Sequence, residues 1–118
     1  MLAGEILEAG SLQEADMILN QHDLDLVICD ISMGKESGIN LLERWGRDVA
    51  FIMLSIFETQ FYVEKCMSLG ARAYLAKGTD PKQLLDTVNR ILHEIPLRKT
   101  VALKTPQSDD HVLKNLSP

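Results

Sequence analysis

Two short segments of the sequence are apolar on consecutive residues, and they restrict the possible folds most strongly. Residues 24–30 read Leu-Asp-Leu-Val-Ile-Cys-Asp, and residues 49–55 read Val-Ala-Phe-Ile-Met-Leu-Ser. A continuous apolar run of this length is typical of a strand that is buried on both faces, as in a parallel sheet between layers of helices. A weaker strand pattern occurs at residues 71–77 and a shorter one at residues 5–9. The sequence therefore predicts a parallel sheet.

Segments with helical spacing lie between these predicted strands. Ser11 and Glu14 have the spacing of a capping box at the start of a helix. Asp80 followed by Pro81 suits the start of the last helix, and Gly70 is placed to end the helix before it. Strand and helix thus alternate four times with short connections. This alternation predicts right-handed βαβ units, with helices on both faces of the sheet.

Composition narrows the possible classes of protein. The length of 118 residues suits one domain. Seventeen acidic and 12 basic residues give a net charge of −5, which argues against nucleic-acid binding by this segment itself. No apolar run approaches the roughly 20 residues that cross a bilayer, and Cys29 and Cys66 lack metal-site or disulfide spacing. We therefore expect a cytoplasmic protein without membrane contact, in which both cysteines are buried.

Three polar side chains follow three of the predicted strands directly. Asp30, Ser55 and Lys77 each end an apolar segment, and in parallel α/β sheets the chemistry gathers at the carboxyl ends of the strands. A carboxylate there can attack phosphorus and form an acyl phosphate. An ammonium group and a hydroxyl group can then bind the phosphoryl oxygens. Taken alone, each residue is more often a turn former or a solvated side chain; together they indicate phosphoryl chemistry.

These residues and their surroundings resemble the receiver domain of two-component response regulators. Residues 29–38, Cys-Asp-Ile-Ser-Met-Gly-Lys-Glu-Ser-Gly, are similar to the family's D-[IL]-x-M-P-x-x-x-G loop, and residues 53–55 and 70–77 match its later motifs in order. The resemblance covers roughly residues 3–94. It implies a flavodoxin-like (CheY-like), doubly wound parallel sheet in residues 1–94.

The resemblance also assigns a role to each site residue. Asp30 is expected to accept the phosphoryl group, Ser55 to be the switch hydroxyl, and Lys77 to pair with the phosphoryl group. Tyr74 is expected to swing inward when Ser55 moves, although it could equally be a packing residue. The main-chain carbonyl of Ser32 is expected to bind Mg²⁺ together with Asp30.

The sequence departs from the family at its start. Receivers begin with a strand that ends in two adjacent acids, which hold the metal, and neither Glu5 nor Glu8 follows a suitable strand. We therefore expect an incomplete sheet that lacks the family's first strand and helix, and an N-terminal truncation. The missing strand lies centrally in the family's order 2-1-3-4-5, so we expect a partner, another segment or upstream sequence to fill its place. Gly34 and Gly78 stand where the family usually has proline.

The last part of the chain, residues 95–118, is expected to be a linker or tail toward an absent output domain. Residues 115–118, Asn-Leu-Ser-Pro, resemble the start of a LuxR-type helix-turn-helix domain. The sequence of residues 29–33 also resembles receivers that carry such an output domain. An alternative is a circular permutation, in which residues 100–103 replace the first strand and Asp109-Asp110-His111 replace its acids. The linker interpretation is preferred, because five residues separate the acids from the apolar run.

The function implied is a phosphorylation-controlled signalling domain that regulates transcription through a DNA-binding output domain outside this chain. A histidine kinase is the expected phosphodonor and a homodimer the expected assembly. No enzymatic activity is expected beyond self-phosphorylation and self-dephosphorylation of Asp30. The alternative is a degenerate receiver that acts as a phosphorylation-independent interaction module. A third, weaker hypothesis is an unrelated α/β small-molecule binder, which the lack of a glycine-rich phosphate loop disfavours.

Overall fold

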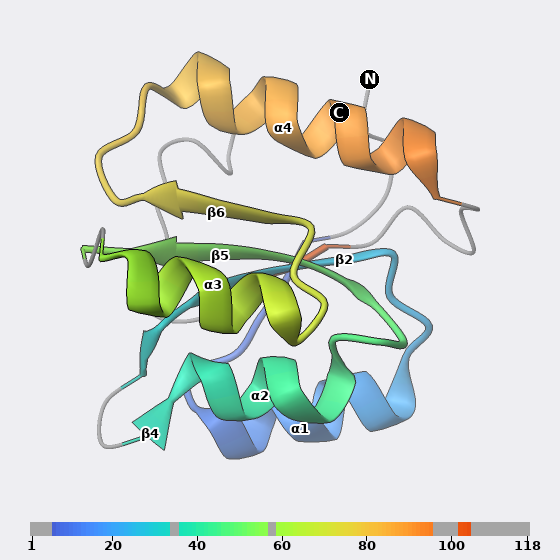
Figure 1. The fold of residues 1–118 in the computed structure, drawn as a ribbon. Coiled ribbons are helices and arrows are strands. Elements are labelled where there is room, and N and C mark those ends of the chain that lie inside the picture. The colour runs from blue at the N-terminus through green and yellow to red at the C-terminus, as the bar shows by residue number, and fades with distance from the viewer. Residues whose placement is uncertain (1–5, 34–35, 57–58, 96–101, 105–118) are drawn as a thin grey trace.

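The computed structural model of the chain describes residues 6–33, 36–56, 59–95 and 102–104. Strands and helices alternate along these residues, as the sequence predicts (Figure 1). The strands are β1 (Ile6–Glu8), β2 (Leu26–Asp30), β3 (Ser32–Met33), β4 (Glu36–Ser37), β5 (Ala50–Ser55), β6 (Ala73–Ala76) and β7 (Ala102–Lys104). The helices are α1 (Leu12–Gln21), α2 (Gly38–Trp45), α3 (Gln60–Ser68) and α4 (Pro81–Glu94). None of these helices is long and apolar enough to cross a membrane.

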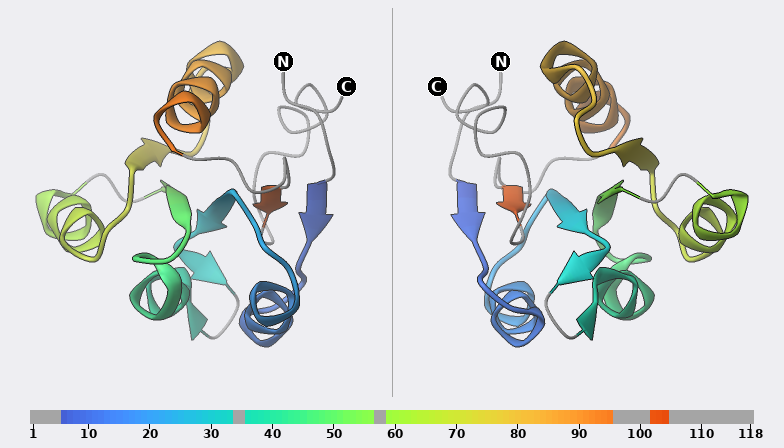
Figure 2. Two further views of the ribbon diagram at one scale, coloured as in Figure 1. Left: turned by 90° about the vertical axis from the view of Figure 1, so that its right-hand side faces the viewer. Right: turned by 90° about the vertical axis from the view of Figure 1, so that its left-hand side faces the viewer.

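Five of the described strands form one parallel sheet in the order β1-β7-β2-β5-β6 (Figure 2). The predicted parallel α/β fold is therefore confirmed. β3 and β4 form a separate small antiparallel ladder directly after β2. The main sheet places β2 and β5 in its interior, where each strand needs hydrogen-bonding partners along both edges.

The central position of the sheet is occupied by another segment of the chain, one of the three fillers expected from the sequence, and this corrects two other expectations. The prediction of an incomplete sheet is wrong for the described strands, and so is the interpretation of residues 102–104 as linker. β7 pairs with β1 on one side and with β2 on the other, and Leu103 lies between Leu7 and Val27. The physical reason is that the facing edges of β1 and β2 would otherwise leave backbone groups unpaired inside the protein. The strand part of the permutation alternative thus holds, whereas Asp109-Asp110-His111 lies outside the described residues.

Two apolar layers enclose the sheet because consecutive residues of each strand point to opposite faces. On one face, Val27 and Cys29 of β2 belong to a cluster that contains residues of α1, α2 and α3. On the other face, Leu26 and Ile28 pack in a cluster with α4. In chain order, β1, β2, β5 and β6 proceed across the sheet in one direction, whereas the chain from β6 through α4 to β7 returns in the other direction. Because each crossover is right-handed, this reversal places α4 on the face opposite to α1, α2 and α3. This is why both faces of β2 are buried.

The residues predicted to begin or end helices do so in the structure. Ser11 Oγ accepts a hydrogen bond from the backbone N–H of Glu14, and Asp80 Oδ1 accepts one from Lys82 N–H at 2.9 Å. Gly70, just after α3, has a φ of 103°, which an L side chain rarely adopts. Local sequence therefore determined where these helices begin and end.

Both cysteines are buried and free, as the sequence predicts. Burial raises the pKa of the Cys66 thiol, because the apolar surroundings disfavour the thiolate. A protonated, buried thiol behaves as a small apolar side chain. Cys66 is accordingly part of the core cluster beneath α3.

Polar contacts join α1 to α2 on the face of the sheet that these two helices cover. The indole N–H of Trp45 donates to Asp16 Oδ1 at 2.7 Å, and Arg44 Nη1 lies 2.9 Å from Asp16 Oδ2. The hydrogen bond from Trp45, followed by the contacts with Arg44, lowers the pKa of Asp16 against the opposing effect of burial. The charged form of Asp16 is therefore the form that stabilises the folded state.

We expect Asp16→Asn to lower the free energy of unfolding at pH 7 by about 1 kcal/mol. Because the pKa of Asp16 is lower in the folded state, its contribution is present above the unfolded value and is lost as the pH falls through the folded value. The difference between the variant and the parent should thus shrink below about pH 4. Urea unfolding followed by circular dichroism measures it, with the exposed Asp86→Asn as control; a difference that is independent of pH would contradict the assignment.

Replacement of Leu103 by proline tests the place of β7. Proline removes a backbone N–H and is excluded from interior strands, so we expect Leu103→Pro to lower the free energy of unfolding by about 2 kcal/mol or more. Leu103→Val keeps the N–H and should cost far less. Thermal unfolding compares the two variants, and equal stabilities would show that residue 103 is not in an interior strand.

Candidate functional site

The three polar residues predicted from the sequence meet at the carboxyl edge of the sheet. Asp30 is the last residue of β2, Ser55 the last of β5, and Lys77 follows β6 directly. The strands are in register there, since Asp30 pairs with Leu54 and Ser55 with Ala76. The backbone N–H of Lys77 donates to the carbonyl oxygen of Ser55 at 2.8 Å. The parallel sheet thus gathers side chains from three separate segments.

An ion pair lies at the centre of this site. Lys77 Nζ contacts Asp30 Oδ2. The Asp30 side chain is only 1% exposed, whereas the Lys77 side chain is 24% exposed. A carboxylate that is buried this deeply requires a nearby charge or hydrogen-bond donors. The site therefore holds a desolvated carboxylate next to a cation that remains accessible from the solvent.

The second oxygen of Asp30 is held by the chain that follows it. Ser32 N–H donates to Asp30 Oδ1 at 2.8 Å, so the carboxylate caps the turn that leaves β2. Ser32 then pairs with Ser37 in the β3–β4 ladder, and Gly38 N–H donates to the carbonyl oxygen of Ile31 at 2.7 Å. These contacts bring the β3–β4 ladder and Gly38 back against the end of β2. They orient the Asp30 carboxylate.

Gly38 allows this close return of the chain. A Cβ atom at position 38 would lie 2.1 Å from the carbonyl oxygen of Asp30 and 2.7 Å from Cys29 Sγ, both far inside van der Waals contact. Only glycine lets the start of α2 approach the end of β2 this closely. In the sequence Gly38 is recognised only as the last residue of the motif, and its close approach to Asp30 is seen only in the structure.

Ser55 and Tyr74 lie on one face of the sheet. Tyr74 is paired with Met53, and Ser55 lies two residues beyond Met53 on β5, so the alternation of side chains places both on the face covered by α3. Ser55 is buried at 1% exposure, and Tyr74 is half-buried against the core cluster on that face. Ser55 and Tyr74 thus lie on neighbouring strands of the same face.

The residue after Lys77 is Gly78, at a position where the family usually has proline. Gly78 has a φ of 85°, in the left-handed region that proline cannot reach. Thr79 N–H closes the turn by donating to the carbonyl oxygen of Ala76 at 3.1 Å. Glycine at position 78 thus permits a tight turn that keeps Lys77 at the edge of the sheet.

The described residues offer only part of a metal site. Asp30 contributes a carboxylate, and the carbonyl group of Ser32 lies two residues further along the chain. In the described ranges, no group of three or more His, Cys, Asp or Glu side chains gathers where it could hold a metal ion. A Mg²⁺ ion prefers six oxygen ligands and usually keeps several waters. A complete metal site would thus need water or other groups besides these two.

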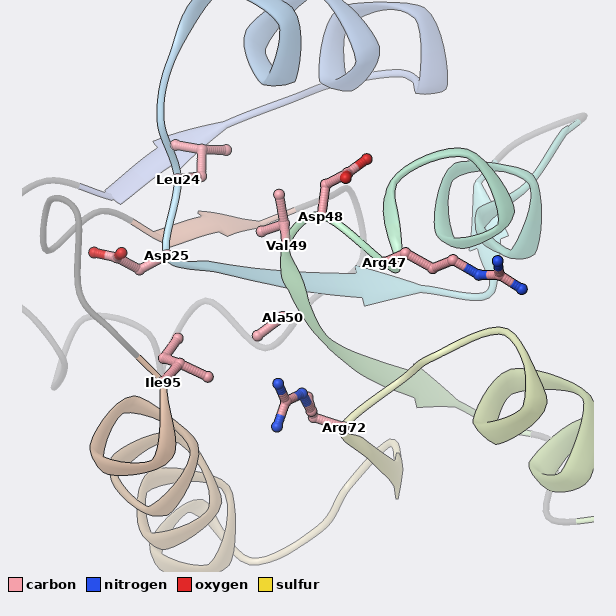
Figure 3. A pocket seen from close by; sticks show the side chains of 9 residues that line it. Leu24, Asp25, Arg47, Asp48, Val49, Ala50, Arg72 and Ile95 are labelled. Carbon is pink, nitrogen blue, oxygen red and sulfur yellow. The ribbon is translucent and has the colours of Figure 1, made fainter.

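A pocket of about 140 Å³ lies at the opposite edge of the sheet (Figure 3). It is lined by Leu24, Asp25, Gly46, Arg47, Asp48, Val49, Ala50, Arg72 and Ile95. Its lining comes from the amino ends of β2, β5 and β6 and from the residues that follow α2 and α4, whereas Asp30 and Ser55 end β2 and β5. This hollow is therefore separate from the site that contains Asp30, Ser55 and Lys77.

Comparison with known proteins agrees with this geometry. Residues 2–89 match the response regulator receiver domain family. The transcriptional regulatory protein UhpA of Escherichia coli (strain K12) is 36% identical over 86 residues, which cover 73% of this chain and 44% of UhpA. The nitrate/nitrite response regulator protein NarP of the same organism is 31% identical over 86 residues, covering 70% of this chain and 40% of NarP. The chain thus spans less than half the length of these curated relatives.

A solved structure gives the same fold at lower identity. The receiver domain of the Francisella response regulator 1452 has a TM-score of 0.69 and 19% identity, and the match covers 76% of this chain and 97% of that chain. At this identity the likeness concerns the fold alone. Together with the match over most of the sequence, these findings establish that the chain belongs to the response regulator receiver domain family.

Proposed function

We propose that this chain is a phosphorylation-controlled receiver that accepts a phosphoryl group on Asp30. The observation that carries the proposal is the buried ion pair between Asp30 and Lys77, with Ser55 at the end of the neighbouring strand. An Asp30 oxygen attacks the phosphorus of a phosphohistidine in a histidine kinase. The bond between phosphorus and the imidazole nitrogen breaks, that nitrogen keeps the electron pair, and Asp30 becomes an acyl phosphate.

The cation and the hydroxyl group have separate roles in this proposal. Phosphorylation adds negative charge, so Lys77 exchanges its contact with the carboxylate for one with a phosphoryl oxygen. Ser55 turns toward another phosphoryl oxygen and vacates the space beside the α3 face. Tyr74 shares that face and fills the vacated space. The surface around α3 and β6 would then shift between two states.

A magnesium ion is part of the proposal because a carboxylate nucleophile and a phosphate repel each other. Asp30 and the carbonyl of Ser32 are the described groups that would hold it. One structure of the same fold, a response regulator from Burkholderia pseudomallei, contains a phosphorylated aspartic acid and a calcium ion (TM-score 0.63, 20% identity, covering 73% of this chain and 52% of that chain). When bound, the ion supplies positive charge that offsets this repulsion.

The wider setting is proposed from the relatives. UhpA and NarP carry the names of a transcriptional regulator and a response regulator. We therefore propose that residues 1–94 form the receiver and that it controls a LuxR-type DNA-binding output domain beyond this segment, in a cytoplasmic homodimer. No catalytic activity is proposed apart from the phosphorylation and dephosphorylation of Asp30 itself.

A second candidate function is a receiver that works without phosphorylation. It is favoured by one observation: the described residues hold no cluster of three acidic, histidine or cysteine side chains around Asp30. In that case the ion pair between Asp30 and Lys77 would be a permanent structural contact. The chain would then bind its partners in a single state.

The first experiment separates the two candidates. The chain is incubated with acetyl phosphate in the presence and absence of Mg²⁺, and its intact mass is measured. We expect one added phosphoryl group in the parent chain, more of it with Mg²⁺, and none in Asp30→Asn. Asp48→Asn, which alters an exposed carboxylate at the other edge of the sheet, is the matched control. Lack of any mass gain in the parent would favour the phosphorylation-independent candidate.

The second experiment measures the ion pair. Lys77→Met leaves the buried Asp30 carboxylate without this cation, so we expect the free energy of unfolding to fall by about 2 kcal/mol or more. The same change in an Asp30→Asn background should cost much less, because there is no charge left to neutralise. Chemical unfolding of the four proteins at pH 7 gives the coupling, with the exposed Lys65→Met as control. Purely additive effects would mean that the pair contributes nothing.

A further inference from the structure

The pocket at the amino edge of the sheet has the size of a small-molecule site (Figure 3). Its volume of about 140 Å³ corresponds to roughly five water molecules, so it admits a ligand of only a few heavy atoms and excludes a nucleotide. Four of its lining residues are apolar, namely Leu24, Val49, Ala50 and Ile95. One part of the pocket therefore suits a short aliphatic chain.

The backbone around the pocket is held in place by contacts within the fold. The backbone N–H of Arg72 donates to the carbonyl oxygen of Phe51 at 2.8 Å, which fixes the start of β6 beside β5. A Cβ atom at Gly46 would lie 2.8 Å from the carbonyl oxygen of Leu69, so the chain that leaves α2 packs closely against the end of α3. The walls of the pocket are thus formed without a ligand, as is usual for small-molecule sites.

Arg72 supplies hydrogen-bond donors to this pocket. It precedes β6, and its side chain extends into the pocket on the side of Ile95 (Figure 3). The ion pairs found among the described residues involve Arg44, Lys77 and Arg90, and none of them involves Arg72. A guanidinium group binds a carboxylate through two parallel N–H···O hydrogen bonds. The Arg72 side chain therefore suits a ligand that carries a carboxylate.

The charges around the pocket favour a ligand with a single negative charge. Arg47 and Arg72 line it together with Asp25 and Asp48, so the formal charges of these four side chains cancel. The helices α2 and α4 end at this edge, and the carboxyl end of a helix carries a partial negative charge. A doubly charged anion such as phosphate is repelled more strongly by these groups than a single carboxylate is.

We propose that this pocket binds a small aliphatic monocarboxylate, of which propionate is the simplest probe. The carboxylate binds the Arg72 guanidinium, and the aliphatic part lies against Val49, Ala50 and Ile95. The ligand has few atoms and the chain has a net charge of −5, so we expect a dissociation constant in roughly the millimolar range. The pocket and Asp30 lie at opposite edges of the sheet, and the inference does not depend on phosphorylation.

Titration of the ¹⁵N-labelled chain with sodium propionate tests the site, with backbone amide chemical shifts measured by NMR. We expect saturating shifts at Val49, Ala50 and Arg72. The affinity should rise from formate to acetate to propionate by up to about fourfold for each added CH₂, because the aliphatic part is buried. Arg72→Gln should weaken propionate binding about tenfold or more. Arg90→Gln, which changes an arginine outside the pocket, is the matched control and should leave the affinity unchanged.

Parallel titrations with sodium chloride and sodium phosphate separate a specific site from general effects of salt and charge. If the shifts in the parent chain grow linearly with propionate and match those from sodium chloride, the pocket binds no carboxylate and the proposal is wrong. Equal affinities of the parent and Arg72→Gln would also overturn it, as would saturating shifts at Ser55 and Lys77 in place of the amino edge. Phosphate binding as tight as that of propionate would contradict the assignment to a monocarboxylate.

Discussion

The edge of β2 that faces β1 has to be hydrogen-bonded, and much of the structure depends on this requirement. β2 is buried along all five residues, with one apolar cluster on each face. Its other edge is paired with β5. An unpaired edge in this place would leave buried backbone groups without partners. β7 meets the requirement by entering between β1 and β2, and β1 thereby becomes part of the sheet.

The candidate site depends on the same pairing. Asp30 ends β2, and its position relative to Ser55 and Lys77 is fixed because β2, β5 and β6 are in register. The carboxylate is further oriented by Ser32 N–H and by the return of the chain at Gly38. The sheet edge therefore holds the Asp30 carboxylate, while the side chain of Lys77 remains accessible to solvent. This combination of a fixed carboxylate and an accessible cation is what the proposed phosphorylation switch requires.

Much of the site could be predicted from the sequence because its members end recognisable strands. Asp30, Ser55 and Lys77 each follow an apolar run, and parallel strands bring such residues to one edge. The contact of Gly38 with Asp30 could not be predicted, because it depends on how the β3–β4 ladder returns the chain to the end of β2. Nor could the face shared by Ser55 and Tyr74 be assigned before the register of β5 and β6 was known. Register is set by packing of whole strands, which local sequence does not specify.

The sequence by itself determined the order of strands and helices, the helix ends at Ser11, Gly70 and Asp80, and the three residues that meet in the site. Each of these follows from local patterns of apolar residues, caps and turns. Only the tertiary structure decided that residues 102–104 form the central strand. These residues have a weak strand pattern of their own and a polar sequence after them. They become a strand because the facing edges of β1 and β2, far from residues 102–104 in the sequence, need backbone hydrogen-bonding partners between them.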